Sequence, residues 1–144
     1  MKTRFSRVSM PRKIARVGAV LIALTAGIAA FPASASAYSA GQCHYGEGAG
    51  NGDGNNNVIL MQIYRCPDGH DYVSGLIKNP SGGWARVWID DSTDGGATWK
   101  GFRLYAEGYD AVTTGNTLYY DGYPHQTRVC GDADGGFTFC TSWY

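Results

Sequence analysis

The sequence predicts an all-β protein: a small antiparallel β-sandwich of the immunoglobulin-like type, stapled by disulfides, with about seven or eight strands. Turn-forming dipeptides recur throughout the chain after residue 37, a region that holds 19 of the 21 glycines. Short runs rich in Val, Ile, Tyr and Trp lie between these turns, and none of them has the period of a helix. Many short strands at regular spacing are typical of a sandwich or a small barrel.

Seven of these runs predict strands, and an eighth near residues 109–113 does so more weakly. Turn signals such as Asn79-Pro80 and Asp121-Gly122 separate neighbouring runs. In chain order the seven expected strands are residues 58–66, 72–78, 84–91, 98–105, 118–120, 126–130 and 137–143.

The first 37 residues predict a secretory signal peptide. A basic leader that ends at Arg16 precedes an apolar run over residues 17–30, which is too short for a membrane span. Small residues then supply cleavage sites, with the cut expected after Ala37 and a cut after Ala35 as the alternative. We therefore expect a secreted, extracellular protein without a membrane anchor, folded as one domain over residues 38–144.

Removal of this leader changes the net charge. The whole chain carries 12 basic and 12 acidic residues, but half of the basic residues lie in the leader and every acidic residue follows it. The exported form therefore has a net charge of −6. An acidic domain of this kind is soluble and repels nucleic acid and anionic lipid, so we expect a monomer that binds neither.

The four cysteines of this exported chain predict two disulfides. Of the three possible pairings we favour Cys43 with Cys66 and Cys130 with Cys140, because each closes a local loop around a turn-rich stretch. The closely spaced cysteine pairs of a zinc site are missing from the sequence, so we expect no metal there.

Residues 46–57 read GEGAGNGDGNNN and are of low complexity. Their acidic and amide side chains suggest a calcium loop, but the EF-hand pattern fails because Asn56 stands where glycine is required and Gln62 stands where a glutamate is required. The alternative, which we favour, is a flexible loop held at its ends by Cys43 and Cys66.

Residues 92–99 read STDGGATW, a Ser-x-Asp-Gly-Gly-x-Thr-Trp pattern. It resembles the Asp-box of sialidases through Ser92, Asp94, Gly96, Thr98 and Trp99. In that family the Asp-box is a structural hairpin away from the catalytic pocket, so the resemblance implies stability and no chemistry. A sialidase propeller repeats the box and needs about 40–50 residues for each blade, whereas this chain is short and carries it once.

Two longer stretches resemble parts of small secreted actinobacterial β-sandwich proteins of unassigned function. They are VWIDDSTDGGATW and the ending RVCGDADGGFTFCTSWY. This resemblance implies a β-sandwich and no activity. The chain is also similar to small two-disulfide α-amylase inhibitors, but their Trp-Arg-Tyr triplet is missing, and Trp84-Ala85-Arg86 comes nearest to it.

No catalytic constellation stands out, and we expect neither an enzyme nor a cofactor. The three histidines are scattered, and every cysteine is assigned to a disulfide. Carboxylate pairs such as Asp90-Asp91 and Asp132/Asp134 lie next to turns, where carboxylates are usually turn-formers, although an acid–base pair among them stays open.

The candidate ligand-binding residues are Trp84, Arg86 and Trp88. They alternate with Ala85, Val87 and Ile89, so a strand directs the two sets to opposite faces, the small aliphatic set toward the core. Aromatic rings on an exposed sheet face suit a protein or a polysaccharide. The alternative is that one or both tryptophans pack against a second sheet or a covering loop. We expect a non-catalytic binding module, with a carbohydrate-binding module or a hydrolase inhibitor as alternatives.

Overall fold

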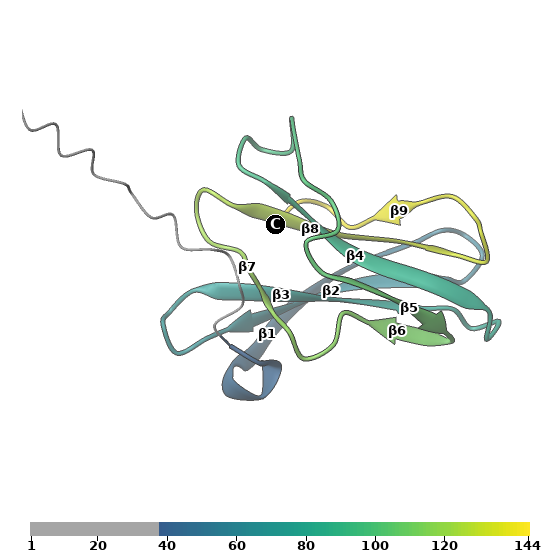
Figure 1. Cartoon of the computed structure of the whole chain (residues 1–144), viewed down its shortest axis with the longest axis horizontal. Coiled ribbons are helices and arrows are strands. Elements are labelled where there is room, and N and C mark those ends of the chain that lie inside the picture. The colour runs from purple at the N-terminus through teal and green to yellow at the C-terminus, as the bar shows by residue number, and fades with distance from the viewer. Residues whose placement is uncertain (1–37) are drawn as a thin grey trace, which may run out of the picture. The chain divides into compact units, whose positions relative to one another are not determined.

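The computed structural model describes residues 38–144, and the expected signal peptide and its cleavage site lie outside these described residues. Described residues form nine strands and one short 3-10 turn (Figure 1). In chain order they are η1 (Ala40–Gln42), β1 (His44–Gly52), β2 (Val58–Arg65), β3 (Asp71–Lys78), β4 (Trp84–Ser92), β5 (Tyr105–Tyr109), β6 (Ala111–Thr113), β7 (Tyr119–Tyr120), β8 (Gln126–Ala133) and β9 (Phe139–Cys140).

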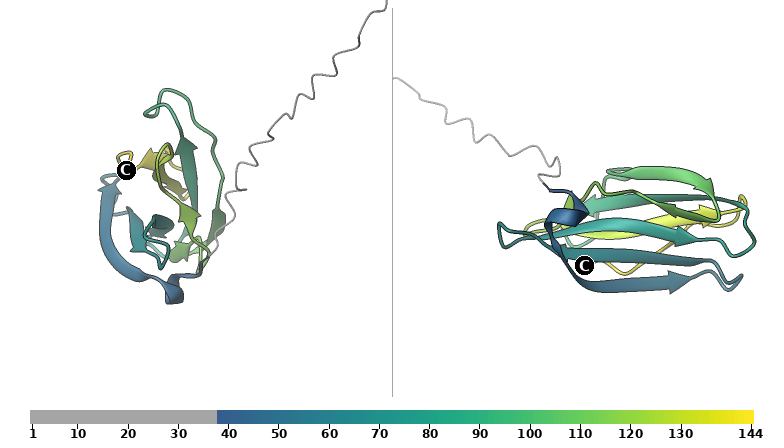
Figure 2. Two further views of the ribbon diagram at one scale, coloured as in Figure 1. Left: turned by 90° about the vertical axis from the view of Figure 1, so that its left-hand side faces the viewer. Right: turned by 90° about the horizontal axis from the view of Figure 1, so that it is seen from below.

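The strands build two antiparallel sheets, which confirms the predicted all-β fold class. One sheet has the order β1-β2-β3-β6, with β7 also paired to β3, and the other has the order β5-β4-β8-β9. The two sheets lie face to face as layers (Figure 2). Because β5 and β6 belong to different sheets, Asp110 between them forms the corner, with a φ of 66° that aspartate tolerates better than most residues.

The core lies between the sheets and follows the period of two that strands impose. On β4 the side chains of Ala85, Val87 and Ile89 are fully buried, as the alternation of the sequence predicted. Gly75 of β3 marks a close approach of the layers, because a Cβ there would stand 2.9 Å from a methyl of Val129. From the facing sheet the core receives Ile59, Met61, Ile63, Val73 and Ile77.

The prediction of a flexible loop over residues 46–57 is wrong for most of its length. Strand β1 runs through this segment and pairs with β2 from His44 to Gly52. Glycine has low strand propensity, but here the hydrogen bonds of β2 hold an edge strand in place. A Cβ at Gly50 would stand 2.8 Å from the side chain of Leu60, so the glycine leaves room for a large neighbour. Only the turn after Gly52 remains a loop.

The strand expected over residues 98–105 is also placed wrongly. Lys100 still exchanges two backbone hydrogen bonds with Asp91, and the backbones of Arg103 and Leu104 both bond to Ile89, but the regular strand starts only at Tyr105. Between them the chain bulges outward at Phe102, whose φ is 57°. An aromatic residue rarely adopts this left-handed conformation, and such strain is held only where surrounding contacts fix it.

The other expected strands are found with changed ends. Strand β8 continues past the expected residue 130 to Ala133, while β7 and β9 are shorter than expected. Both predicted disulfides are confirmed: Cys43–Cys66 joins the segments at the start of β1 and the end of β2, and Cys130–Cys140 joins β8 to β9. Disulfides of this kind fit an oxidising environment. Within residues 38–144, no helix is long and apolar enough to span a membrane.

Candidate ligand-binding face

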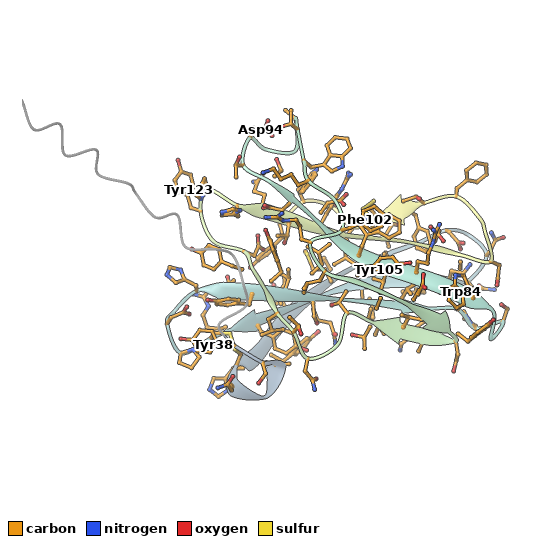
Figure 3. All side chains as sticks on the ribbon, in the orientation of Figure 1. Tyr38, Trp84, Asp94, Phe102, Tyr105 and Tyr123 are labelled. Atoms are coloured by element: carbon orange, nitrogen blue, oxygen red, sulfur yellow. A yellow bond between two sulfur atoms is a disulfide. The ribbon has the colours of Figure 1, made fainter. Side chains whose placement is uncertain are left out.

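Strand β4 directs Trp84, Arg86 and Trp88 away from the core, onto the outer surface of its sheet. Strand β5 lies beside it in register, with Tyr109 opposite Trp84, Glu107 opposite Arg86 and Tyr105 opposite Trp88. We call this surface the aromatic face. It consists of these six residues together with Phe102, which precedes β5. Figure 3 labels three of its members, Trp84, Phe102 and Tyr105.

Trp88 is not an exposed ring. Only 8% of its surface is accessible, because the ring of Phe102 stacks on it with centroids 4.9 Å apart. The alternative of a tryptophan packed under a covering loop is therefore correct for Trp88. The ring that faces solvent in its place is Phe102, which is 61% exposed and is presented by the bulge described above. Tyr105 continues this ring surface, with its centroid 5.7 Å from that of Phe102.

Trp84 lies at the other end of the aromatic face and is half-buried. Tyr109 meets it edge to face, with ring centroids 5.2 Å apart, and is itself 69% exposed. Ala85 between Trp84 and Arg86 is fully buried, so these three residues do not form a continuous exposed triplet. The aromatic face thus has a ring cluster at each end and a charged residue between them.

Arg86 is that charged residue, and it is held firmly. Its Nε and Nη2 donate to the two oxygens of Asp132 at 2.9 and 2.6 Å, a bidentate pair. The hydrogen bonds that Arg86 donates to Asp132, followed by the charge of Asp132, raise the pKa of Arg86. The Arg86 side chain stays 45% exposed while Asp132 is buried. Because Asp132 fixes the guanidinium of Arg86, the remaining N–H groups of Arg86 are preorganised to donate to a ligand.

A second cation lies further along the same outer surface. Arg128 lies between the rings of Trp99 and Trp143, at 4.7 and 4.6 Å from their centroids, and its Nε donates to Asp90 at 3.0 Å. Trp143 also packs on the loop after β4, where a Cβ at Gly96 would stand 2.4 Å from its Nε1. This cluster joins Asp90, Trp99, Arg128 and Trp143, which are separated in the sequence. The one sequence signal for it was the strand alternation, which places Asp90 on the same face as Trp88.

The loop that resembles an Asp-box is closed by its own side chains. Ser92 Oγ accepts from the backbone N–H of Gly96 at 2.8 Å, and Asp94 Oδ1 accepts from the backbone N–H of Thr98 at 2.8 Å. Hydrogen bonds from Thr98, its hydroxyl first, lower the pKa of Asp94 to about 2. Trp99 is 53% exposed, so the ring covers Arg128 and is not buried in the hairpin.

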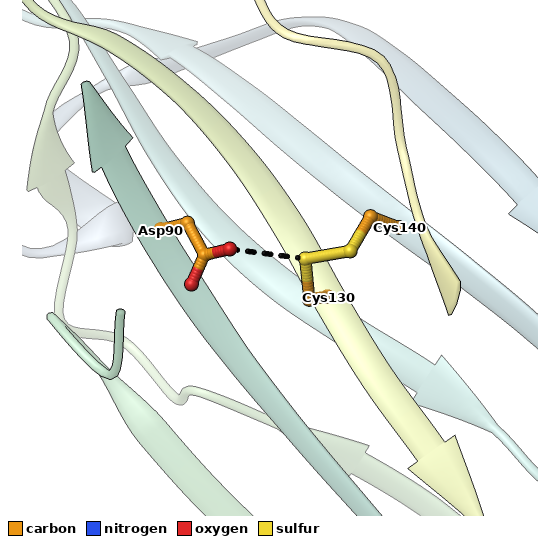
Figure 4. Close-up of side chains that lie close together, drawn as sticks. All are labelled: Asp90, Cys130 and Cys140. Atoms are coloured by element: carbon orange, nitrogen blue, oxygen red, sulfur yellow. Dashed lines mark hydrogen bonds between the residues drawn. A yellow bond between two sulfur atoms is a disulfide. The ribbon is translucent and has the colours of Figure 1, made fainter. Parts of the chain in front are cut away.

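Asp90 touches the disulfide between Cys130 and Cys140 (Figure 4). Its Oδ2 lies 3.3 Å from Cys130 Sγ, but a disulfide sulfur has no proton to donate, so this is a packing contact. These three residues are also the only compact His/Cys/Asp/Glu group among residues 38–144. Since both sulfurs are bonded to each other, the group cannot supply thiolate ligands to a metal.

The carboxylates considered as acid–base pairs each have a separate structural partner. Neighbouring carboxylates therefore serve different local contacts instead of sharing one reacting centre. The pairs formed are Asp90 with Arg128, Asp91 with His125, Asp132 with Arg86, and Asp134 with Asn79.

Comparison with protein-family models, with curated proteins and with solved structures finds no match to this chain. The function is therefore argued from the chemistry of its surface.

Proposed function

We propose that this chain is a secreted, non-catalytic binding module that recognises an extracellular macromolecule through the aromatic face. The observation that carries the proposal is the exposure of Phe102 and Tyr109 beside an arginine that Asp132 holds in place. Trp, Tyr and Arg are the residues that most often dominate binding energy in protein interfaces. The bidentate pair of Arg86 also means that little side-chain entropy is lost when a ligand accepts its remaining hydrogen bonds.

A polysaccharide is the second candidate ligand, and the separation of the ring clusters favours it. Tyr109 and Phe102 present exposed rings at the two ends of the aromatic face, with Arg86 and Glu107 between them. Rings of this kind stack on the apolar faces of sugars while polar side chains between them reach hydroxyl groups. The paired carboxylates and the disulfide-bonded cysteines support a role without catalysis.

The experiment measures binding by proteins altered only on this face. Tyr109→Ala removes the most exposed ring of the face, and Phe102→Gly removes a ring while accepting the φ of 57°. The matched control is Phe137→Ala, since Phe137 is 96% exposed on the turn before β9. Each protein is immobilised and tested against proteins of the culture medium, and its sedimentation with chitin and starch is measured.

The wild type and Phe137→Ala should retain the same protein or polysaccharide, and both face variants should lose it. A ligand retained equally by all four proteins would place binding elsewhere and contradict the proposal. Retention of chitin or starch in this pattern selects the polysaccharide, and retention of a medium protein selects the protein partner.

A further inference from the structure

An open pocket of about 450 Å³ lies beside the loop after β4. It lies between this loop and the segment that leads into β8, and Asp94 and Tyr123 from its two sides are labelled at the same end of the molecule in Figure 3. Trp84 lies toward the opposite end of β4. The residues that line the pocket include none of the aromatic face.

Asp121 lines this pocket and is only 7% exposed, yet neither of its carboxylate oxygens accepts a hydrogen bond of ordinary geometry within the described chain. The N–H and hydroxyl of Thr127 lie close enough to lower its pKa in part, but they donate to the Tyr144 carbonyl oxygen and to Met61 Sδ. The Oε1 of Gln126, which lines the same pocket, also lacks a hydrogen-bond partner there. Buried polar atoms in native proteins nearly always have a partner, and an exception calls for an explanation. All three unpartnered atoms are hydrogen-bond acceptors, so the group they lack is a donor.

The charges around Asp121 make a cation the fitting donor. Burial raises the pKa of the Asp121 carboxyl to about 7; the donors of Thr127 offset part of this effect, and the charges of Asp71 and Asp91 add to it. Those two neighbours already have cationic partners, since Arg65 Nε lies 2.6 Å from Asp71 and Arg103 Nε lies 3.9 Å from Asp91. No lysine or arginine lines the pocket, and Asp94 adds a further carboxylate to its wall.

Two tyrosines complete the surroundings. Tyr123 is 97% exposed and Tyr144 is 46% exposed, so their rings are loosely packed at the pocket. The Tyr144 hydroxyl lies 3.5 Å from Asp71 Oδ2, and burial and then the charges of Asp71 and Asp121 raise its pKa. The oxygens of Asp121 lie beneath the pocket surface, so an amine reaches them when the side chains that line the pocket move. Aromatic faces also attract cations directly.

We propose that this pocket binds a protonated primary amine, with the carboxylate of Asp121 and the amide oxygen of Gln126 accepting its N–H groups. An ammonium carries three donors and no acceptor, which matches three acceptors without donors. A calcium ion fits less well because it takes six to eight oxygens. The ligand class is therefore an alkylamine, free or as a lysine side chain on a partner, and the acidic net charge of the exported form favours its approach.

The test titrates the purified protein with butylammonium chloride at pH 8 and low salt, and follows binding by NMR chemical shifts. Butan-1-ol is the uncharged control ligand, and calcium chloride is titrated separately. Asp121→Asn keeps the shape of the side chain and removes its charge. Asp110→Asn removes the same charge at the corner between β5 and β6, and asparagine tolerates the φ of 66° found there.

Butylammonium should bind saturably and butan-1-ol should not. Asp121→Asn should weaken the amine by about tenfold or more, because hydrogen bonds to a charged acceptor are among the strongest. Asp110→Asn should bind within about twofold of the wild type, since Asp110 is exposed and does not line the pocket. Tyr123→Ala, at a position that is 97% exposed, should weaken binding several-fold.

Equal binding of butan-1-ol, or full affinity in Asp121→Asn, would overturn the proposal. Saturable binding of calcium with no response to the amine would also overturn it and identify a metal site. None of these results depends on the aromatic face, so this inference and the proposed function can fail separately.

Discussion

Asparagine in place of Asp121 should make the protein more stable at neutral and alkaline pH, although the variant loses a charge and gains no contact. The wild-type carboxylate is buried, accepts no hydrogen bond of ordinary geometry within residues 38–144, and has Asp71 and Asp91 near it. An ionised group in such a place raises the free energy of the folded state, because water solvates it better in the unfolded chain.

The size of the effect follows from the pKa. The carboxyl of Asp121 has a pKa of about 7 in the folded protein against an ordinary value of 3.8. A raised folded-state pKa means that the stability contributed by the protonated carboxyl is fully present below pH 3.8 and is lost as the pH rises through 7. At about 1.36 kcal/mol for each pH unit, the loss approaches roughly 4 kcal/mol by pH 8. Asparagine does not titrate and avoids this loss.

The assay compares urea denaturation of the wild type and Asp121→Asn between pH 4 and pH 8. The two free energies of unfolding should be similar near pH 4 and should diverge in favour of the variant up to pH 8, by as much as about 4 kcal/mol. All other titratable groups are the same in both proteins, so the contributions that they share largely cancel in the difference. A difference that is constant across this range, or a variant that is less stable at pH 8, would refute the reasoning.

Three further predictions concern the framework. Asp94→Ala should lower the melting temperature relative to Thr93→Ala, because it removes the acceptor for the backbone N–H of Thr98, and equal melting would contradict this. Trp99→Ala should cost only about 1 kcal/mol in denaturant unfolding, the value of a partly exposed cation–π contact, and a loss of several kcal/mol would mean that the ring is buried. Removal of the Cys130–Cys140 disulfide by a double serine variant should cost about 2–3 kcal/mol, checked against the reduced wild type, which should lose at least as much.

The sequence predicted those parts of the fold that are specified by residues close together in the chain. The alternation through Ala85, Val87 and Ile89 assigns strand β4 and its inner face without knowledge of the partner strands. Strand β1 could not be found in this way, since its glycines carry no strand signal. Its conformation comes from the hydrogen bonds of β2 and from side chains such as Leu60 that occupy the space above the glycines.

The candidate ligand-binding face was predicted in part for the same reason. Trp84 and Arg86 point outward because the period of the strand requires it. Trp88 is buried because the bulge places the ring of Phe102 on it. The cluster around Arg128 depends on a contact with Trp143, which lies near the C-terminal end of the sequence. Contacts between distant segments of this kind leave no local pattern in a single sequence.

Two aspartates with similar sequence surroundings show why contacts between distant segments matter for function. Asp94 and Asp121 each precede a glycine, and both look like turn-formers. Asp94 finds its donors within four residues, and these hydrogen bonds hold its pKa at about 2. Asp121 accepts no hydrogen bond of ordinary geometry within the described chain, and burial raises its pKa to about 7 although Thr127 offsets part of the rise. The first carboxylate therefore stabilises the fold by itself, whereas the second destabilises it at neutral pH unless a donor arrives from outside. Asparagine at position 121 would make the fold more stable, yet the residue there is an aspartate. Ligand binding explains this choice better than fold stability does.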